Sequence, residues 1–420
     1  MKSILFFAAM LFTSVAAWAQ SSAAKPVILK SPADFQILDI SPNGKWACGC
    51  FNDYSYVNYG FRWNLESDEV EMLSTTATSE AFAITNDGVV VGMYTDNTYN
   101  ANGADFQMPG YYKDGSWHAL ELPAGTLESG MAYAVTPDGQ YIAGVVVTNG
   151  IFAGYVWKDG KLYRTLDNTR HAIPYGISPD GQSATGWVQQ YNRTACYWDA
   201  EGNTNMLSDY QSPWSSGRSF SPDGTKILYW GGWDDGEVPQ LYAVYDIATK
   251  TSSKLPTIRQ EAGLDVLDIS NKGTVVGFED QMGYIYQDGK AQYIDEYLTA
   301  KGIDLSTLGV LLGTGEEEVA DDARYQLFRV QCISPDDDIL GIIYYDDSKD
   351  EEGNYAVSMR SMIIKFNETA TNLSPVAVKA QQLSGIMSAL VTWKKNVAAD
   401  GVTGYNLYRN GVKVNDAPLT

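Results

Sequence analysis

The chain has 420 residues, of which 45% are hydrophobic, 12% aromatic and 19% charged, a composition typical of a folded protein that excludes a disordered one. Its formal net charge of −22 disfavours nucleic acid and anionic lipid as partners, because such surfaces repel an acidic protein. A simpler role of this acidity is to keep the protein soluble. The 39 glycines and 28 tyrosines suit many short strands joined by tight turns.

The first 19 residues have the pattern of a signal peptide. Lys2 precedes an apolar run from Ile4 to Val15, and Ala17-Trp18-Ala19 provides the small residues that a signal peptidase requires. We therefore expect residues 1–19 to be removed before Gln20, and the mature protein to be secreted, extracellular or held at the cell surface. The apolar run is too short to cross a bilayer and no later segment is longer, so we do not expect the protein to be membrane-embedded.

A seven-residue motif recurs through the chain, and each copy reads as the end of a strand followed by a tight turn. The copies are LDISPNG (38–44), FAITNDG (82–88), YAVTPDG (133–139), YGISPDG (175–181), RSFSPDG (218–224), LDISNKG (267–273) and QCISPDD (331–337). Proline suits the first central position of such a turn, Asn or Asp bonds its own backbone, and glycine takes the positive φ that closes the hairpin. Asp337 replaces the last glycine, so we expect a strained or wider turn there.

Each copy continues with three more strands. After Gly139, for example, come a β-branched strand, the aromatic strand GYVWKDG (154–160) and a variable fourth strand. Four antiparallel strands repeated every 42–51 residues, with one step of 64, predict an all-β fold: a seven-bladed β-propeller of four-stranded blades over residues 20–373. The long step is expected to be an insertion with a short helix near Tyr293–Ala300, and Pro26–Lys30 to complete the last blade and close the ring.

The pattern of a small residue, Ile-Ser-Pro-Asp-Gly, Val-Val-Gly and then Gly-Tyr-x-Trp resembles the secreted bacterial HAF-type repeat proteins and, more loosely, propellers of the TolB and WD40 superfamilies. The chain lacks the Trp-Asp and Gly-His signatures of WD40 blades. The resemblance covers roughly residues 35–365 and implies a propeller and secretion, but no particular activity, because propellers host many functions.

Residues 374–420 have a different pattern. Two predicted strands, one of them with Trp393, precede a hairpin signalled by Asn410-Gly411. Trp393 and the run Gly404–Arg409 resemble a fibronectin type III module, an immunoglobulin-like sandwich of about 90–100 residues. Only 47 residues are present, so we expect a partial fibronectin type III domain, an incomplete sandwich of low stability.

Catalytic and metal-binding motifs are absent from the sequence, and we predict no catalytic residue, no metal site and no cofactor. The chain has only two histidines, His118 and His171, and packing explains His118 well. Residues 346–353 resemble a calcium loop without its glycine, and we favour a solvated loop over calcium binding. We expect buried free thiols at the four cysteines, Cys48, Cys50, Cys196 and Cys332.

The loops between second and third strands are rich in aromatic, amide and acidic residues, which suit stacking on sugar rings or gripping a peptide. The candidate ligand-binding residues are Tyr94, Trp187, Tyr191, Trp230, Trp233, Asp234 and Asp235. The alternative for each aromatic residue is packing between blades.

We therefore expect a binding or adhesion protein for a glycan or an extracellular protein. One alternative is a secreted enzyme that degrades a polysaccharide or peptide with carboxylates such as Asp53, Asp234 or Asp235. The other is a passive spacer module.

Overall fold

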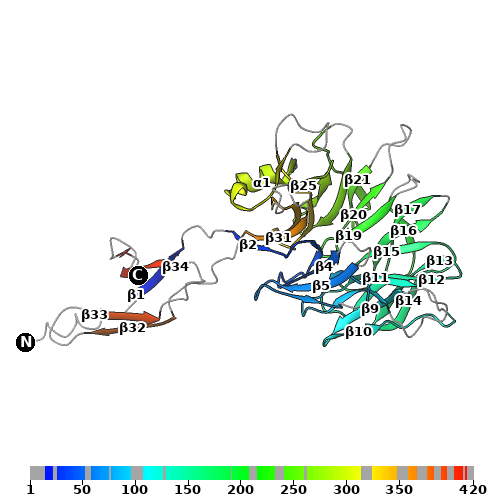
Figure 1. Ribbon diagram of the computed structural model, residues 1–420, viewed down its shortest axis with the longest axis horizontal. Coiled ribbons are helices and arrows are strands. Elements are labelled where there is room, and N and C mark those ends of the chain that lie inside the picture. The colour runs from blue at the N-terminus through cyan, green and yellow to red at the C-terminus, as the bar shows by residue number, and fades with distance from the viewer. Residues whose placement is uncertain are drawn as a thin grey trace, which may run out of the picture. The chain divides into compact units, whose positions relative to one another are not determined.

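The computed structural model shown in Figure 1 divides the chain into two units, residues 28–364 and residues 1–27 with 365–420, which are described separately. The structure describes residues 15–21, 26–52, 58–74, 77–95, 107–125, 129–190, 192–207, 215–231, 241–259, 263–313, 324–347, 358–366, 376–382, 389–394, 402–409 and 412–413.

The large unit is a seven-bladed β-propeller of four-stranded blades, as predicted. Blade 1 contains β3 (Phe35–Ile40), β4 (Trp46–Asn52), β5 (Asn58–Asn64) and β6 (Glu69–Met72). Blade 2 contains β7 (Ser79–Ile84), β8 (Val90–Thr95), β9 (Gln107–Lys113) and β10 (Ser116–Ala119). Blade 3 contains β11 (Gly130–Val135), β12 (Tyr141–Thr148), β13 (Ile151–Lys158) and β14 (Lys161–Asp167).

The next three blades follow the same antiparallel order. Blade 4 contains β15 (Ala172–Ile177), β16 (Ala184–Gln189), β17 (Arg193–Trp198) and β18 (Thr204–Met206). Blade 5 contains β19 (Ser216–Phe220), β20 (Lys226–Gly231), β21 (Leu241–Asp246) and β22 (Thr251–Lys254). Blade 6 contains β23 (Leu264–Ile269), β24 (Val275–Glu279), β25 (Met282–Gln287) and β26 (Lys290–Tyr293).

Blade 7 is built from both ends of the propeller sequence. Its inner strands are β29 (Arg329–Ile333), β30 (Ile339–Tyr345) and β31 (Met359–Lys365), and β2 (Val27–Lys30) is its outermost strand. The prediction that Pro26–Lys30 closes the ring is therefore confirmed. Residues 367–373, which follow β31 in the chain, lie outside the described residues.

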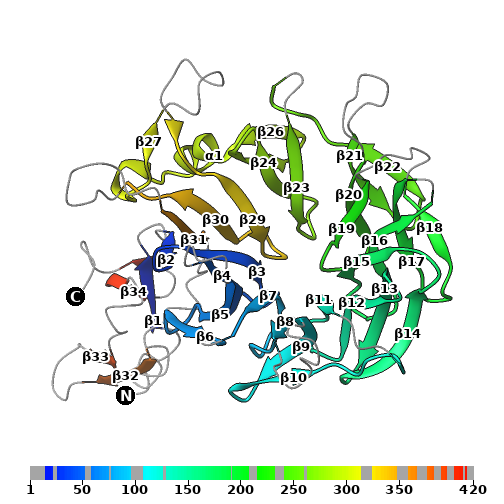
Figure 2. The ribbon, with the colours of Figure 1, turned by 45° about the vertical axis from the view of Figure 1, so that its right-hand side comes forward.

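The first strand of every blade is the innermost one. Consecutive innermost strands contact each other around the whole ring, and Figure 2 shows them surrounding the propeller axis. The second and third strands of a blade are buried on both faces because a neighbouring blade packs on each side, as in β12 and β13. Outer strands alternate between exposed and partly buried residues, as in β14, because only one face packs on the protein.

The Ser-Pro-Asp-Gly motifs form the turns between first and second strands. In blade 4 the Ser178 hydroxyl donates to Asp180 Oδ1 at 2.6 Å and accepts the Ser183 N–H at 2.9 Å, while Gly181 N–H donates to the Ser178 carbonyl at 2.8 Å. Gly181 has φ +71°, which glycine adopts without strain. These motifs are therefore structural turns.

In the last turn Asp337 takes the glycine position at φ +62°, a conformation that strains a residue with a Cβ. The turn is not wider, because Asp337 N–H still donates to the Ser334 carbonyl at 3.2 Å. The Ser334 hydroxyl donates to Asp338, so the bonded carboxylate lies two residues later than in the other copies. The expectation of a strained or wider turn is thus met by the strained backbone of Asp337.

The long step between blades 6 and 7 is an insertion with a helix, as predicted. Helix α1 (Ile294–Ala300) follows β26 directly, and a 3-10 turn, η2 (Leu305–Thr307), comes next. The remainder of its described part is a two-stranded pair, β27 (Leu312–Gly313) with β28 (Arg324–Tyr325), which is too small to be a blade. Residues 314–323, which include the acidic Glu316–Glu318, lie outside the described residues.

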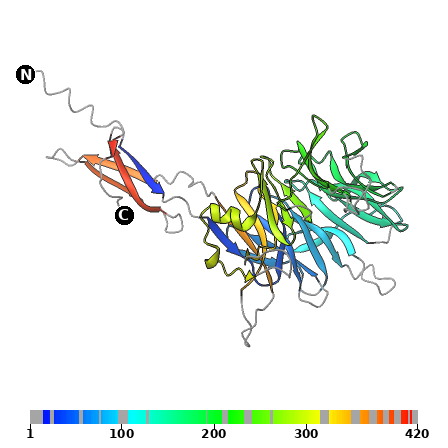
Figure 3. The ribbon, with the colours of Figure 1, turned by 90° about the horizontal axis from the view of Figure 1, so that it is seen from above.

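The described residues of the small unit form two sheets. Strands β32 (Val376–Gln382) and β33 (Ala389–Lys394) pair with each other, and β34 (Val402–Arg409) forms the predicted hairpin with β35 (Val412–Lys413). Strand β1 (Val15–Ser21) pairs antiparallel with β34, and Figure 3 shows the two side by side, β1 in blue and β34 in red. The predicted cleavage point after Ala19 therefore falls within β1.

All four cysteines are free, and Cys48, Cys196 and Cys332 are buried while Cys50 is partly buried. Burial raises the pKa of the Cys50 thiol to about 12, which makes it a poor nucleophile. Among the described residues, none of the helices has the length and apolar character needed to cross a membrane.

Candidate functional site

Every innermost strand contains a β-bulge at the same position. The pairing register shifts between Ile37 and Asp39, and at the corresponding positions of the other six blades. A bulge inserts one extra residue and re-aims its side chain, and bulges are common beside functional sites. The seven extra residues, here called the bulge ring, are Leu38, Phe82, Tyr133, Tyr175, Arg218, Leu267 and Gln331. They are the first residues of the seven motif copies.

Glycines opposite the bulge on several second strands, including Gly277 of the Val-Val-Gly pattern, are explained by this bulge. Gly186 on β16 lies opposite the bulge of β15, where a Cβ would approach the Ile173 carbonyl oxygen to 1.9 Å. Gly144 on β12 meets the Met131 carbonyl in the same way, at 2.2 Å. Close backbone approach therefore selects glycine on the second strand.

Three consecutive members of the bulge ring are aromatic: Phe82, Tyr133 and Tyr175, here called the aromatic arc. The ring centroids of Phe82 and Tyr133 lie 5.1 Å apart with the ring planes tilted by 40°, and those of Tyr133 and Tyr175 lie 5.0 Å apart, edge to face at 64°, so the three rings pack on one another across blades 2, 3 and 4. All three side chains are only partly buried. Partly exposed aromatic rings at the propeller axis can stack on a ligand.

Trp187, one of the predicted ligand-binding residues, supports the aromatic arc from behind. It is 5% exposed and packs with Val145 and Ile173, and Tyr133 and Tyr175 pack against the same cluster. The Arg193 guanidinium lies over the Trp187 ring at 4.5 Å. The structure thus places Trp187 in the packing between blades, where its connection to the bulge ring runs through Tyr133 and Tyr175.

The opposite side of the ring, in blades 5 to 7, is polar. Arg218 Nη2 donates to both carboxylate oxygens of Asp265, at 3.0 and 3.3 Å. Arg329 Nη2 donates to Gln36 Oε1 at 3.3 Å, and Gln331 Nε2 donates to the Leu38 carbonyl at 3.5 Å. Arg218, Asp265, Arg329 and Gln331 are here called the polar arc.

Two further carboxylates, Asp39 and Asp268, lie on innermost strands one residue after the bulge. Asp39 accepts backbone N–H groups from Ile40 at 2.8 Å and from Ile84 of the next blade at 2.9 Å. Asp268 accepts the equivalent bonds from Ile269 at 2.8 Å and Ile333 at 3.0 Å. Each carboxylate therefore joins two neighbouring blades.

Burial raises the pKa of Asp39 to about 7 and that of Asp268 to about 6, although the four backbone bonds favour the charged forms. The negative charge of Asp268 also raises the pKa of Asp39. Both side chains retain some exposed surface, so protein surrounds them without sealing them from water. Among the described carboxylates of the innermost strands, these two have the pKa values that are raised furthest.

The other predicted ligand-binding residues have different surroundings. Trp230, on β20, is partly buried, and the Arg218 guanidinium lies 5.4 Å from its ring, so it adjoins the polar arc. Tyr94, on β8, stacks on Trp117 of the same blade with centroids 5.3 Å apart. The remaining four, Tyr191, Trp233, Asp234 and Asp235, lie outside the described residues, as does Asp53.

Neither histidine has a catalytic arrangement in the described part of the chain. His118 stacks on Tyr111 at 5.1 Å and contacts the Ser116 hydroxyl at 3.2 Å, on an exposed outer strand. His171 Nδ1 accepts the Phe152 N–H at 3.2 Å. Within the described ranges, no group of three or more His, Cys, Asp or Glu residues could hold a metal ion.

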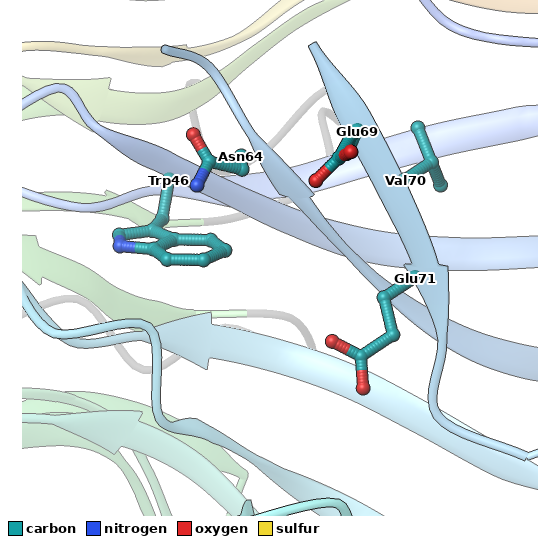
Figure 4. Close-up of a pocket in the computed structure, with 5 residues that line it drawn as sticks. All are labelled: Trp46, Asn64, Glu69, Val70 and Glu71. Atoms are coloured by element: carbon teal, nitrogen blue, oxygen red, sulfur yellow. The ribbon is translucent and has the colours of Figure 1, made fainter. Parts of the chain in front are cut away.

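A pocket of about 420 Å³ lies away from the axis, on blade 1. Figure 4 shows Trp46, Asn64, Glu69 and Glu71 around it, with Val70 between the two glutamates. Glu71 already accepts bonds from Arg62 at 2.7 Å and from the Tyr112 hydroxyl at 3.0 Å. Because the Glu71 carboxylate already accepts hydrogen bonds from the protein, this pocket is a weaker candidate for a ligand site than the innermost strands.

No protein-family model matches the sequence, and no curated protein matches it. Among solved structures, the chain is similar to an oligogalacturonate lyase in complex with manganese, at 11% identity over 84% of this chain and 96% of that chain, with a TM-score of 0.52. It is also similar to the oligogalacturonate lyase of Vibrio parahaemolyticus, at 12% identity over 83% and 99% of the two chains, with a TM-score of 0.50.

TolB from Acinetobacter baumannii is a third similar structure, at 16% identity and a TM-score of 0.41. The match covers 59% of this chain and 62% of the TolB chain, so it spans less than two thirds of TolB. The likeness to the two lyases, at 11% and 12% identity, shows the fold alone and no activity.

Proposed function

We propose that this chain is an exported, non-catalytic binding protein of the cell surface whose ligand is a glycan held at the propeller axis. The observation that carries the proposal is the aromatic arc, in which three partly exposed rings on consecutive blades lie 5.1 and 5.0 Å apart. A partly exposed aromatic ring can stack on the apolar face of a sugar ring. The proposed ligand-binding surface is therefore the bulge ring, whereas the sequence predicted the loops between second and third strands.

The proposed arrangement of the chain supports this function. A signal peptide over residues 1–19 would export the protein, and HAF-type repeats over roughly residues 35–365 would form the ligand-binding propeller. The strands of residues 376–413 are compatible with part of a fibronectin type III module, which would act as a spacer. Trp233, Asp234 and Asp235, next to Trp230 in the chain, stay candidates for extending the binding surface.

The test is a glycan-array screen followed by calorimetry with the best glycan. Tyr175→Leu and Tyr133→Leu keep apolar volume but remove the flat ring, and each is expected to weaken binding about 3–10-fold, the equivalent of roughly 0.5–1.5 kcal/mol. Tyr163→Leu is the matched control, because Tyr163 is 49% exposed on the outer strand β14. Equal affinity for all three variants and the unaltered protein would contradict the proposal, and failure to bind any glycan would favour a passive spacer.

A secreted hydrolase is the second candidate, favoured by Asp39 and Asp268. Their pKa values are raised to about 7 and about 6, so near neutral pH Asp39 keeps its proton more readily than Asp268, a difference of the kind that acid–base catalysis uses. Against it, all four carboxylate oxygens accept backbone N–H bonds. Incubating the bound glycan with the protein and with Asp39→Asn would decide: chain shortening lost in the variant would favour the enzyme.

A further inference from the structure

The pocket on blade 1 is bounded by a row of side chains that the strand register places together. Trp46 on β4 lies opposite Asn64 on β5, and Asn64 lies opposite Glu69 on β6. Directly opposed residues on one face of a sheet have Cβ atoms about 4.5–5.5 Å apart, and Figure 4 shows these side chains around the cavity of about 420 Å³. The Asn64 Oδ1 already accepts the Glu66 N–H at 2.9 Å, so the row offers a ligand mainly an indole ring and a carboxylate.

The neighbouring row on the same face is satisfied by the protein itself. Arg62 lies opposite Glu71, two residues further along each strand, and its guanidinium donates to the Glu71 carboxylate at 2.7 Å. Arg62 also donates to the Gly88 carbonyl of blade 2 at 2.8 Å, and the Tyr112 hydroxyl donates to Glu71 at 3.0 Å. The charge of Glu71 is therefore balanced inside the protein, and Glu71 contributes little to binding a ligand.

Glu69 has no such counter-charge. It is exposed, and the one side chain that donates to it is the Ser67 hydroxyl, at 3.3 Å. Lys45, which lies on the same blade, pairs instead with Glu66 at 3.0 Å. In the part of the chain that the structure describes, no lysine or arginine forms an ion pair with Glu69. The pocket therefore has an accessible carboxylate whose charge the protein leaves to solvent or to a ligand.

Trp46 provides the apolar side of the pocket and is held in place without a ligand. Gly88 of blade 2 lies so close that a Cβ there would come within 2.8 Å of the indole Cε2. The Arg62 guanidinium lies 5.4 Å from the centre of the indole ring. Trp46 is only partly buried, and part of it lines the cavity. An aromatic ring beside a carboxylate suits an ammonium group on an alkyl stem, because the ring attracts cations and also packs on methylene groups.

We infer that this pocket binds a protonated primary amine, the lysine side chain of a peptide or protein, with the ammonium group at Glu69 and the alkyl stem on Trp46. The site is separate from the glycan surface proposed above, because it lies on the three outer strands of blade 1. A cation is favoured over a neutral sugar because Glu69 lacks a counter-charge and Asp68 adds a further negative charge beside it in the chain. The net charge of −22 also attracts cationic partners.

The test is calorimetry on the full chain with two probes, Nα-acetyl-lysine amide and the same compound acetylated on its ε-amine. The unaltered protein is expected to bind the charged probe about tenfold more tightly, and this preference should weaken as salt rises. Glu69→Gln keeps the shape but removes the charge, and is expected to reduce the preference to about 2–3-fold. Trp46→Leu is expected to weaken binding of the charged probe about 3–10-fold.

Glu201→Gln is the matched control, because Glu201 is an exposed acidic residue in the turn between β17 and β18, and it should bind both probes as the unaltered protein does. Thermal unfolding of Trp46→Leu checks that its fold is intact. Tyr175→Leu should leave binding of the lysine probe unchanged, so this result is independent of the proposed glycan surface. Equal binding of the two probes, no binding of either, or tighter binding of glucose would overturn the inference. Tighter binding of glucosamine than of the lysine probe would overturn the assignment to a lysine side chain.

Discussion

The Asp39 carboxylate of blade 1 accepts the Ile84 N–H of blade 2 at 2.9 Å, and Asp268 repeats this bond from blade 6 to blade 7. Both acids occupy the position after the bulge, where the other blades have Ala83, Ala134, Gly176, Ser219 and Cys332. A carboxylate at this position can reach a backbone N–H on the free edge of the next innermost strand, since each innermost strand is the edge strand of its sheet. Asp39 therefore joins blade 1 to blade 2, and Asp268 joins blade 6 to blade 7, the blade that closes the ring.

These two carboxyls predict an unusual pH dependence of stability. Their pKa values in the fold, about 7 and about 6, lie above the ordinary value of 3.8, so the folded state binds protons more tightly than the unfolded chain. Stability from this source is fully present below about pH 4 and is lost as the pH rises to about 7. The turn carboxylates Asp138 and Asp223 have lowered pKa values, and their contribution is lost only as the pH falls below about 4.

We therefore expect the free energy of unfolding to be greatest on the acid side of neutral, near pH 5. Urea unfolding between pH 4 and pH 8 measures it, and Asp39→Asn is expected to reduce the fall in stability above pH 5 by about 1–3 kcal/mol. Asp159→Asn, at an exposed turn, is the control and should leave the profile unchanged. A profile of Asp39→Asn parallel to that of the unaltered protein would contradict the role of Asp39.

Ser361 is expected to be essential for the closure of the ring. Its side chain is fully buried. Its hydroxyl accepts the Ile37 N–H of blade 1 at 2.8 Å and donates to the Phe35 carbonyl at 2.9 Å. Its N–H donates to the Ser31 hydroxyl at 2.9 Å. Ser361→Ala leaves the Ile37 N–H unbonded in the core, which should cost about 1–3 kcal/mol in urea unfolding. Ser253→Ala, on the exposed strand β22, should cost almost nothing, and equal costs would refute this account.

Asp337 provides a test of backbone strain. Its φ of +62° is a glycine-like conformation, so Asp337→Gly removes the strain while Asp337→Ala retains it. Both changes remove the bond from the Thr274 hydroxyl to Asp337 Oδ2, at 2.9 Å, so the comparison cancels that loss. The glycine variant is expected to be about 1 kcal/mol more stable than the alanine variant in thermal unfolding.

The neighbouring Asp336 serves as the control for this comparison. It has no positive φ, so at this position alanine should be the more stable of the two substitutions because glycine adds freedom to the unfolded chain. The same order of alanine and glycine at positions 336 and 337 would contradict the strain at Asp337.

Much of the fold could be predicted from the sequence because its turns repeat. The seven copies of the turn motif predicted the number of blades, and the segment Pro26–Lys30 was available to complete the last blade. The bulges could not be predicted, because a bulge depends on pairing across two strands and leaves only an indirect trace, the glycine at positions such as 186. The bulge ring was therefore missed, although Phe82, Tyr133 and Tyr175 each open a motif copy.

The candidate loop residues show the same limit. Trp187 lies next to a predicted loop in the sequence, where an aromatic residue suggests ligand binding. In the structure Trp187 is only 5% exposed, because the end of a strand can be packed between blades instead of lying in an open loop. Burial and blade-to-blade contact are tertiary properties that one repeat cannot reveal alone. The pairing of Arg218 with Asp265 spans 47 positions and two blades, and no spacing rule indicates it.

The last prediction concerns the N-terminus. If residues 1–19 are a signal peptide, export from a bacterial host should yield a protein that begins at Gln20, and Ala19→Asp should block cleavage because the peptidase requires a small residue there. N-terminal sequencing and intact mass measure this, and an exported protein that retains Met1 would contradict it.

Cleavage at this point has a structural consequence. It removes residues 15–19 of β1, which pair with residues 405–409 of β34, so β34 keeps only its hairpin partner β35 and a remnant of β1. An exposed strand edge without its partner opens readily, so limited proteolysis of the exported protein should cut within residues 376–413 well before the propeller. The propeller blades are protected because each packs against two neighbours in a closed ring. Cleavage of the propeller first would contradict this account, and a Val15–Ser21 peptide added in excess should slow the early cut if β1 pairing protects β34.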